Sequence, residues 1–284
     1  MSATRGRLVF TDLDGSLLDH HTYSFAPAME LLAELDAAAV PVIANSSKTR
    51  VEIESIRADL GNGHPFIVEN GAAVFIPRGY FSAAPPGTIS RGDYWVYEMS
   101  GGRQRWLDAL QHLQARFAGE FDHFYRAGPE GIMSMTGLDA AAAELANQRE
   151  YSEPVQWLGE AARKQAFVAA LEALGARTLQ GGRFLTVAGE CDKGRALAWL
   201  RNVYRAAWGV EEVVDIAAGD SGNDVAMLEA AGTALLIRSP VHDYPVLQRS
   251  DHVLRSTQCG PDGWVEGIRQ WLAVTATDNH EHRT

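Results

Sequence analysis

Two aspartates one residue apart close an apolar segment near the start of the chain. Asp12 and Asp14 follow the run Leu8-Val9-Phe10-Thr11, and Gly15 comes next. If the run is a β-strand, residues two apart point to the same face, so both carboxylates face one side. Two ionised carboxylates about 4 Å apart repel each other by roughly 4 kcal/mol at an effective dielectric constant of 20. The pair therefore indicates a bound cation, a shared proton or an Asp-rich turn in water.

Three further polar clusters stand at the ends of apolar segments or at the start of a helical pattern. Each has a simpler interpretation when taken alone: Ser46 could cap a helix, Lys193 could be solvated, and 219–224 could be a turn. Together they provide carboxylates, hydroxyls and ammonium groups in the pattern of a single site. The clusters are Asn45-Ser46-Ser47-Lys48-Thr49, Asp192-Lys193-Gly194 and Gly219-Asp220-Ser221-Gly222-Asn223-Asp224.

The elements around these clusters alternate between strand and helix patterns, which predicts an α/β fold with a Rossmann-like parallel sheet. In such sheets ligands bind at the carboxyl ends of the strands, so the clusters should meet in one crevice. Asn70-Gly71 is typical of a hairpin turn. We expect strands at 8–11, 40–44, 66–68, 73–76, 213–218 and 234–237, and helices at 26–39, 49–60, 193–203, 225–230 and 263–274.

Length and composition indicate two domains. At 284 residues the chain exceeds the usual size of a single core, and glycines and prolines interrupt all periodicity from 78 to 93. We expect a catalytic core made of 1–82 and 191–284, and an inserted α+β domain at 83–190. The segment 94–99 should be the first strand of the insert.

The charge and the cysteines exclude several classes of protein. A formal charge of −11 argues against a nucleic-acid or membrane-surface binder. No apolar run is long enough to span a bilayer, and Cys191 and Cys259 are too far apart for a CxxC motif. The sequence predicts a cytoplasmic protein that acts on a small molecule, and it leaves the oligomeric state open.

The residue types favour phosphoryl chemistry. Three carboxylates at strand ends suggest a hard cation such as Mg²⁺, which bridges readily to phosphate oxygen. A hydroxyl, backbone N–H groups and an ammonium would hold the phosphate. One Asp carboxylate can accept the phosphoryl group, and a second, two residues later, can transfer the proton.

These four motifs resemble those of the haloacid dehalogenase (HAD) superfamily of phosphohydrolases: DxDxS, a hydroxyl after the second strand, Lys-Gly opening a helix, and GDSGND. The resemblance implies that Asp12 is the nucleophile and Asp14 the general acid/base, and that Ser46 and Lys193 bind the phosphoryl group. It also implies a Mg²⁺ site, and that the insert is the cap domain of this superfamily. The ligands of the Mg²⁺ ion would be Asp12, the carbonyl oxygen of Asp14 and Asp220, with Asp224 as a further ligand or close neighbour and Asn223 in support.

A narrower resemblance lies within the Cof-like subgroup. Ser46-Ser47-Lys48-Thr49 is similar to the form found in mannosyl-3-phosphoglycerate phosphatases, as are the segments 68–72, 149–154 and 181–184. The resemblance implies that Gly182 and Arg183 reach from the cap to a glycerate carboxylate or a sugar, and Arg suits a carboxylate. Ser47, Lys48 and Asn70 are the further candidate substrate contacts. Gly181-Gly182 could also be only a hairpin turn.

The sequence therefore predicts a Mg²⁺-dependent phosphatase that converts mannosyl-3-phosphoglycerate to mannosylglycerate. A phosphatase for glucosyl-3-phosphoglycerate or another sugar phosphate is the near alternative, because the core motifs would be identical. A phosphotransferase or mutase is less favoured, since nothing in the sequence excludes water from the intermediate. A non-catalytic phosphate-binding protein is the alternative from another class, and it has no physical need for paired carboxylates.

Overall fold

A parallel sheet of five strands forms the centre of the computed structural model, which describes residues 5–181 and 183–281, with side chains up to residue 275. The strand order is β13-β12-β11-β1-β2, and every neighbouring pair is parallel. The α/β fold class is therefore confirmed. The strands are β1 (Arg5–Thr11), β2 (Val42–Ala44), β11 (Glu212–Gly219), β12 (Thr233–Arg238) and β13 (Val253–Cys259).

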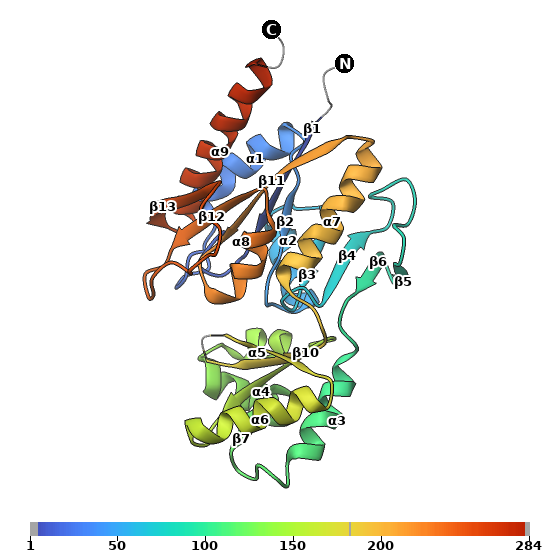
Figure 1. Ribbon diagram of the computed structural model, residues 1–284, viewed down its shortest axis with the longest axis vertical. Helices are drawn as coiled ribbons and strands as arrows, with labels where there is room; N and C mark the ends of the chain where they lie inside the picture. Colours follow the sequence, from blue (N-terminus) through green and yellow to red (C-terminus); the bar gives the residue numbers. More distant parts are fainter. Residues whose placement is uncertain (1–4, 182, 282–284) are drawn as a thin grey trace.

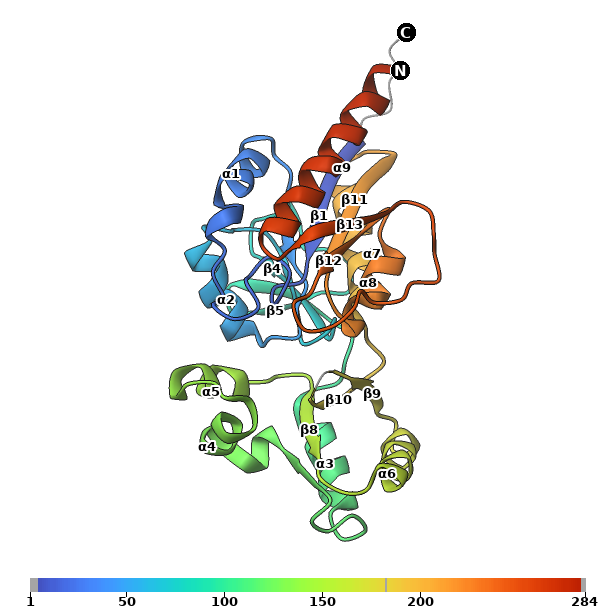
Figure 2. The same ribbon diagram turned by 90° about the vertical axis from the view of Figure 1, so that its left-hand side faces the viewer.

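Helices cover both faces of this sheet, and alternation along the strands explains how. Val9 of β1 packs with α1 and α9 in one buried cluster, whereas Leu8 and Phe10 pack with α7 and α8 in another. Figures 1 and 2 show the helices on the two sides of the sheet, with α9 extending away from the inserted domain. The helices are α1 (Met29–Ala37, after the 3₁₀ turn Ala26–Ala28), α2 (Arg50–Asp59), α7 (Lys193–Trp208), α8 (Val225–Ala230) and α9 (Asp262–Glu281).

A second, antiparallel sheet extends the core and corrects two expectations. The segment 94–98 does not begin the insert but pairs with β4 along its whole length, because β4 leaves an edge free beside it. The strand at 66–68 does not join the parallel sheet except through a bridge between Asn45 and Ile67, since the hairpin at Asn70-Gly71 pairs it with β4. The strands are β3 (Phe66–Val68), β4 (Ala73–Pro77), β5 (Ile89–Arg91) and β6 (Tyr94–Glu98), in the order β3-β4-β6-β5.

The inserted domain lies beyond the carboxyl ends of the parallel strands (Figure 1). Its antiparallel sheet has the order β7-β8-β10-β9 and its own apolar core around Trp106 and Phe167. The sequence missed α4, which contains Gly128 and Pro129 and is kinked there, and it also missed β13. The elements are α3 (Arg103–Leu113), β7 (Phe121–His123), α4 (Phe124–Thr136), α5 (Ala140–Asn147), β8 (Glu153–Trp157), α6 (Ala161–Ala173), β9 (Arg177–Gln180) and β10 (Leu185–Ala188).

The chain crosses between the two domains after β6 and before α7. At this point the Ser100 hydroxyl accepts a hydrogen bond from the Gly189 N–H at 2.9 Å and so joins the two crossings. The limits 1–82, 83–190 and 191–284 stay a prediction, amended by the pairing of β5 and β6 with the core. None of the described helices has the length and apolar character needed to span a membrane.

Candidate active site

Asp12 lies at the carboxyl end of β1, in the middle of the parallel sheet. Its N–H donates to the Ala218 carbonyl oxygen, so the ladder between β1 and β11 fixes its backbone. The residue is 5% exposed, and its Oδ1 accepts a hydrogen bond from Lys193 Nζ at 2.6 Å. Burial and the neighbouring carboxylates raise the pKa of Asp12 well above its ordinary value, although Lys193 opposes the shift.

Lys193 is the first residue of α7, which Asp192 caps by accepting from the Arg195 N–H. Its ammonium is fully buried and also donates to Asp224 Oδ1 at 2.7 Å. Burial alone would lower the pKa of Lys193, but Asp12 and Asp224 outweigh it and the pKa rises. The lysine is therefore charged, and it joins segments that are 181 and 31 residues away from it.

The loop after β11 supplies two more buried carboxylates. Asp224 Oδ2 accepts from the N–H groups of Asp220 and Ser221 at 3.2 and 3.1 Å, which closes the loop on itself. Burial, then repulsion from Asp224, raises the pKa of Asp220 to about 7. Gly15 has a φ of +77°, and a Cβ there would lie 2.7 Å from Asp220 Oδ2. The absence of a side chain at Gly15 thus lets the Asp220 carboxylate lie close to the backbone that follows Asp14.

The donor set of this cluster fits a hard divalent cation. Ligand oxygens of Asp12, Asp220 and Asp224 lie within 4.8 Å of one another, and all three residues are buried. The Lys193 ammonium contacts two of them, Asp12 and Asp224, so the cluster carries an excess of negative charge. Buried charge without a partner is costly, and the raised pKa of Asp12 and of Asp220 expresses that cost. A divalent cation would remove it.

Asp14 occupies a different environment from Asp12. Its Oδ2 pairs with Lys48 Nζ at 2.9 Å, and its side chain is 39% exposed towards the cleft. Its Oδ1 is buried and has no hydrogen-bond partner. Two carboxylates with such different surroundings can take different roles, one as a nucleophile and the other as an acid/base.

The loop after β2 holds Ser46 by its backbone. The Ser46 N–H donates to the Ile67 carbonyl oxygen, and the Ser46 carbonyl oxygen accepts from the Asn70 N–H. Ser46 does not cap α2, because Thr49 does so in a capping box with Glu52. The simpler interpretation of Ser46 is therefore wrong, and its buried hydroxyl accepts a hydrogen bond from the Lys48 N–H at 3.3 Å.

A cleft of about 320 Å³ lies between the core and the inserted domain. It brings together most of the predicted substrate contacts. Arg183 is exposed and donates to the carbonyl oxygens of Met135 and Thr136 at the end of α4. β9 and β10 pair antiparallel with Leu185 opposite Gln180, and Gly181, Arg183 and Phe184 of the connection between them line the cleft. Gly182 lies outside the described residues, so the interpretation of Gly181-Gly182 as a turn stays a prediction. The cleft lining includes Asp14, Ser47, Lys48, Asn70, Arg183 and Asn223.

Sequence reasoning missed three residues at this site. Arg149 lines the cleft from the inserted domain, and the segment 149–154 was its only signal. Tyr23 also lines the cleft, with its ring centroid 5.4 Å from Lys48 Nζ. His242 Nε2 lies 3.5 Å from Asp220 Oδ2. No pattern in the sequence marks Tyr23 or His242, because each depends on a loop folding back onto the site.

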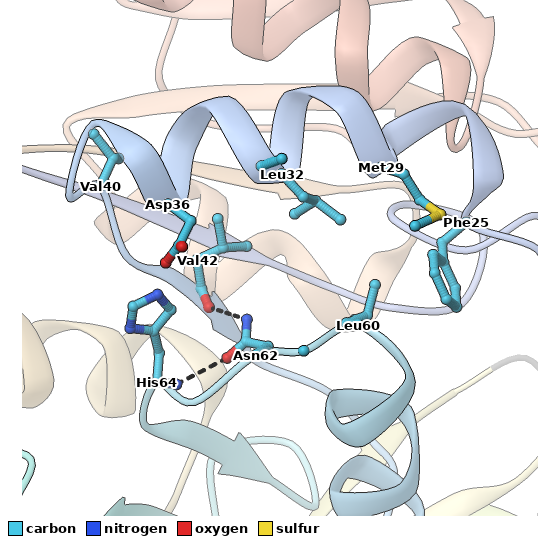
Figure 3. A pocket seen from close by; sticks show the side chains of 11 residues that line it. Phe25, Met29, Leu32, Asp36, Val40, Val42, Leu60, Asn62 and His64 are labelled. Carbon is cyan, nitrogen blue, oxygen red and sulfur yellow. Dashed lines mark hydrogen bonds between the residues drawn. The ribbon is translucent and has the colours of Figure 1, made fainter.

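A second cavity, of about 270 Å³, lies on the core between α1 and the loop at 60–64 (Figure 3). The Asn62 side chain donates to the Val42 carbonyl oxygen and accepts from the His64 N–H, which fixes one wall. Asp36 and His64 lie at one end of an otherwise mostly apolar lining, and burial lowers the pKa of His64. None of the predicted site residues lines this second cavity.

Comparisons with known proteins agree with this geometry. A family model described as sucrose-6F-phosphate phosphohydrolase matches residues 177–272. A glucosyl-3-phosphoglycerate/mannosyl-3-phosphoglycerate phosphatase from Methanococcoides burtonii is 35% identical and covers 92% of this chain and 95% of its own length. A mannosyl-3-phosphoglycerate phosphatase from Pyrococcus furiosus is 36% identical, over 84% of this chain and 93% of its own.

The fold agrees as well. The structure of a HAD-superfamily phosphatase from Bacteroides thetaiotaomicron superimposes with a TM-score of 0.64 at 16% identity, over 93% of this chain and 94% of its own. At that identity the likeness concerns the fold alone. The sequence identity to the two curated relatives shows that the chain is a phosphatase and belongs to the family of glucosyl-3-phosphoglycerate/mannosyl-3-phosphoglycerate phosphatases, and its fold is similar to that of a HAD-superfamily phosphatase.

Proposed function

We propose that this chain is a Mg²⁺-dependent phosphomonoester hydrolase that converts mannosyl-3-phosphoglycerate to mannosylglycerate, with glucosyl-3-phosphoglycerate as the alternative substrate. One observation carries the proposal: Asp12 and Lys193 meet Asp220 and Asp224 beside a cleft whose opposite wall carries Arg149 and Arg183. The names of the relatives support this substrate class.

In the first half-reaction an Asp12 carboxylate oxygen attacks phosphorus. The bond from phosphorus to the substrate oxygen breaks as the aspartyl-phosphate bond forms, and Asp14 donates a proton to the leaving oxygen. Lys193 holds Asp12 by its Oδ1, which leaves Oδ2 as the oxygen that attacks. The Ser46 hydroxyl and the Lys193 ammonium stabilise the transferring phosphoryl group.

In the second half-reaction Asp14, now a carboxylate, takes a proton from water as that water attacks phosphorus. The bond to Asp12 breaks, inorganic phosphate leaves and both aspartates return to their first state. Lys48 pairs with Asp14 in the structure, so we assign to Lys48 the task of orienting this carboxylate as well as contacting substrate. The partial exposure of Asp14 gives the water access.

Asp12, the Asp14 carbonyl oxygen and Asp220 would hold Mg²⁺, with Asp224 as a ligand or as the support of Lys193. Oxygen ligands of this kind suit Mg²⁺, which retains several waters. When bound, the ion would neutralise charge on the phosphoryl oxygens and lower repulsion against Asp12. The excess negative charge of the cluster supports this assignment.

The cleft supports a substrate that carries a carboxylate. Arg183 presents a guanidinium from the inserted domain, and Lys48 and Arg149 add positive charge to the same lining. We propose that Arg183, together with Gly182, binds the glycerate carboxylate or the sugar. Ser47 and Asn70 would contact the substrate between Arg183 and the phosphoryl group at Asp12. The Asn70 side chain is held by Asn223 at 3.2 Å.

A phosphate-release screen tests the substrate. We expect mannosyl- and glucosyl-3-phosphoglycerate to exceed simple sugar phosphates in kcat/KM, and Arg183→Ala to raise KM for the preferred one by about tenfold or more, because a charge-assisted contact is lost. Arg163→Ala is the matched control, since Arg163 pairs with Glu120 on the inserted domain away from the cleft. An unchanged KM in Arg183→Ala would refute the assignment of Arg183.

The same screen separates the remaining alternatives. A binding module would release no phosphate from p-nitrophenyl phosphate with or without Mg²⁺, and a mutase would return labelled phosphate to the sugar rather than to water. The formal charge of −11 supports the further proposal that the protein has no nucleic-acid partner. We also propose that it works in the cytoplasm.

A further inference from the structure

A buried glutamate lies where the inserted domain meets the core, and the proposed chemistry does not use it. Glu69 follows β3, is fully buried and does not line the cleft. Its φ of +49° is in the left-handed region, which a non-glycine residue adopts when its surroundings impose it. A carboxylate buried in this way requires specific donors.

The donors come from one short segment of the inserted domain, residues 150–152, between α5 and β8. Glu69 Oε1 accepts from the Glu150 N–H at 2.7 Å. Its Oε2 accepts from the Ser152 N–H at 2.8 Å and from the Ser152 hydroxyl at 2.6 Å. Arg149 Nε lies 3.3 Å from the same oxygen. One core carboxylate therefore binds consecutive residues of the insert.

The same segment also contacts the first point at which the chain crosses between the domains, and through Ser100 it is linked to the second. The Tyr151 carbonyl oxygen accepts from the Ser100 hydroxyl at 3.1 Å and from Trp106 Nε1 at 2.9 Å. Ser100 in turn accepts from the Gly189 N–H in the second crossing. The contact of Glu69 with 150–152 is thus one of several non-covalent attachments of this segment to the core at the hinge, together with the Arg50–Glu150 ion pair at 2.6 Å and the Tyr151 hydroxyl that donates to Glu98 at 2.8 Å.

The residues next to the Glu69 contact, Arg149 and Asn70, also bind the loop after β2, which carries Ser46 and Ser47. Arg149 Nη2 donates to the Ser47 carbonyl oxygen at 2.9 Å, and Asn70, next to Glu69, donates its N–H to the Ser46 carbonyl oxygen at 2.9 Å. The orientation of the inserted domain is therefore tied by hydrogen bonds to the loop that carries Ser46 and Ser47.

We propose that Glu69 is a positioning residue that fixes the inserted domain over the catalytic loops. It then governs turnover of substrates that reach Arg183 but not of small phosphomonoesters that lack a carboxylate and a sugar. The kinetic part of this inference rests on the proposed function, because it assumes a glycosyl-3-phosphoglycerate substrate. The structural part, that Glu69 orients the inserted domain, rests on the hinge contacts alone.

Glu69→Gln tests the kinetic part. For glycosyl-3-phosphoglycerate we expect kcat/KM to fall more than about tenfold, because an amide replaces a charge-assisted acceptor; for p-nitrophenyl phosphate we expect a fall of less than about threefold. Ser152→Ala, which removes one donor, should show the same selectivity with a smaller effect. Glu120→Gln, which alters an ion pair within the insert, should leave both substrates unchanged.

A distance measurement tests the hinge directly. Spin labels at Asp59→Cys on the core and Glu172→Cys on α6, with Cys191 and Cys259 replaced by Ser, should give a broader distance distribution in Glu69→Gln than in the wild type or Glu120→Gln. An equal fall for both substrates, or an unchanged distribution, would overturn the proposal. If the wild type hydrolyses p-nitrophenyl phosphate but no glycosyl-3-phosphoglycerate, the substrate assignment fails and the distance measurement alone decides the role of Glu69.

Discussion

Two buried groups of charges in this chain have opposite balances. In the catalytic cluster three carboxylates surround the single ammonium of Lys193, and the pKa of Asp12 and that of Asp220 are raised. In the inserted domain Glu153 stands alone among donors: Arg103 Nε at 2.5 Å, His123 Nδ1 at 2.8 Å and the Tyr125 N–H at 2.7 Å. Burial raises the pKa of Glu153, but these donors outweigh it and the pKa is lowered.

The difference separates a structural use of buried charge from a functional one. Around Glu153 the charge is compensated within the fold, so the group stabilises the inserted domain and needs nothing from solution. Around Asp12 the described residues compensate the negative charge only in part, which fits the proposed binding of a divalent cation. Perturbed pKa values of this kind concentrate at functional sites.

The largest expected effect comes from removing the nucleophile. Asp12→Asn should lower kcat by about 10⁴-fold or more, since the amide cannot form the aspartyl-phosphate and the residual rate comes from binding alone. Phosphate release measures the rate, and trapping of labelled phosphoprotein in the wild type but not in the variant identifies the intermediate. A variant within tenfold of the wild type would remove Asp12 from the chemistry.

The next largest effect is expected from replacing Glu153, whose charge is compensated within the inserted domain. Glu153→Gln should lower the free energy of unfolding by about 3 kcal/mol, because it leaves Arg103, whose side chain is only 12% exposed, without its carboxylate. Chemical denaturation measures the change. Arg269→Ala, which breaks the exposed pair with Glu34, is the control and should produce no measurable change.

The contribution of Glu153 also has a definite pH dependence. Its pKa in the folded protein is below the ordinary 4.5, so its stabilisation is complete above pH 4.5 and is lost as pH falls through the lowered pKa. The wild type and Glu153→Gln should therefore converge in stability under acid conditions. A constant difference across this range would contradict the charge compensation inferred here.

A smaller effect, of opposite sign, is expected at the catalytic cluster. The pKa of Asp220 is raised from 3.8 to about 7, so the stability of the cation-free protein falls as the pH rises through this range, and the full cost is present above pH 7. Asp220→Asn should then raise the melting temperature without Mg²⁺ by about 2–4 °C at pH 8, for a gain of about 1 kcal/mol. The wild type should gain stability on adding Mg²⁺, and the variant should gain much less. Thermal scans with and without Mg²⁺ measure both, and a destabilised cation-free variant would contradict the comparison.

Much of the core follows from local patterns. The strand that ends at Asp12 and the helix that begins at Lys193 were predicted, because buried strands and helix caps have short-range sequence signals. The segment 94–98 was assigned to the wrong domain, because strand pairing depends on which edge is free in the folded protein. The kinked α4 was missed because Gly128 and Pro129 are typical of a loop.

The sequence by itself determined the kind of chemistry. The spacing of Asp12 and Asp14 and the acidic loop at 219–224 identify the residue types that phosphoryl transfer needs, since side-chain chemistry is a local property. The tertiary structure decided the pairing of these groups: Lys193 with Asp12 and Asp224, and Lys48 with Asp14. It also decided which groups Glu69 and Arg149 contact, because these contacts join segments that are distant in the chain and meet only when the two domains pack together.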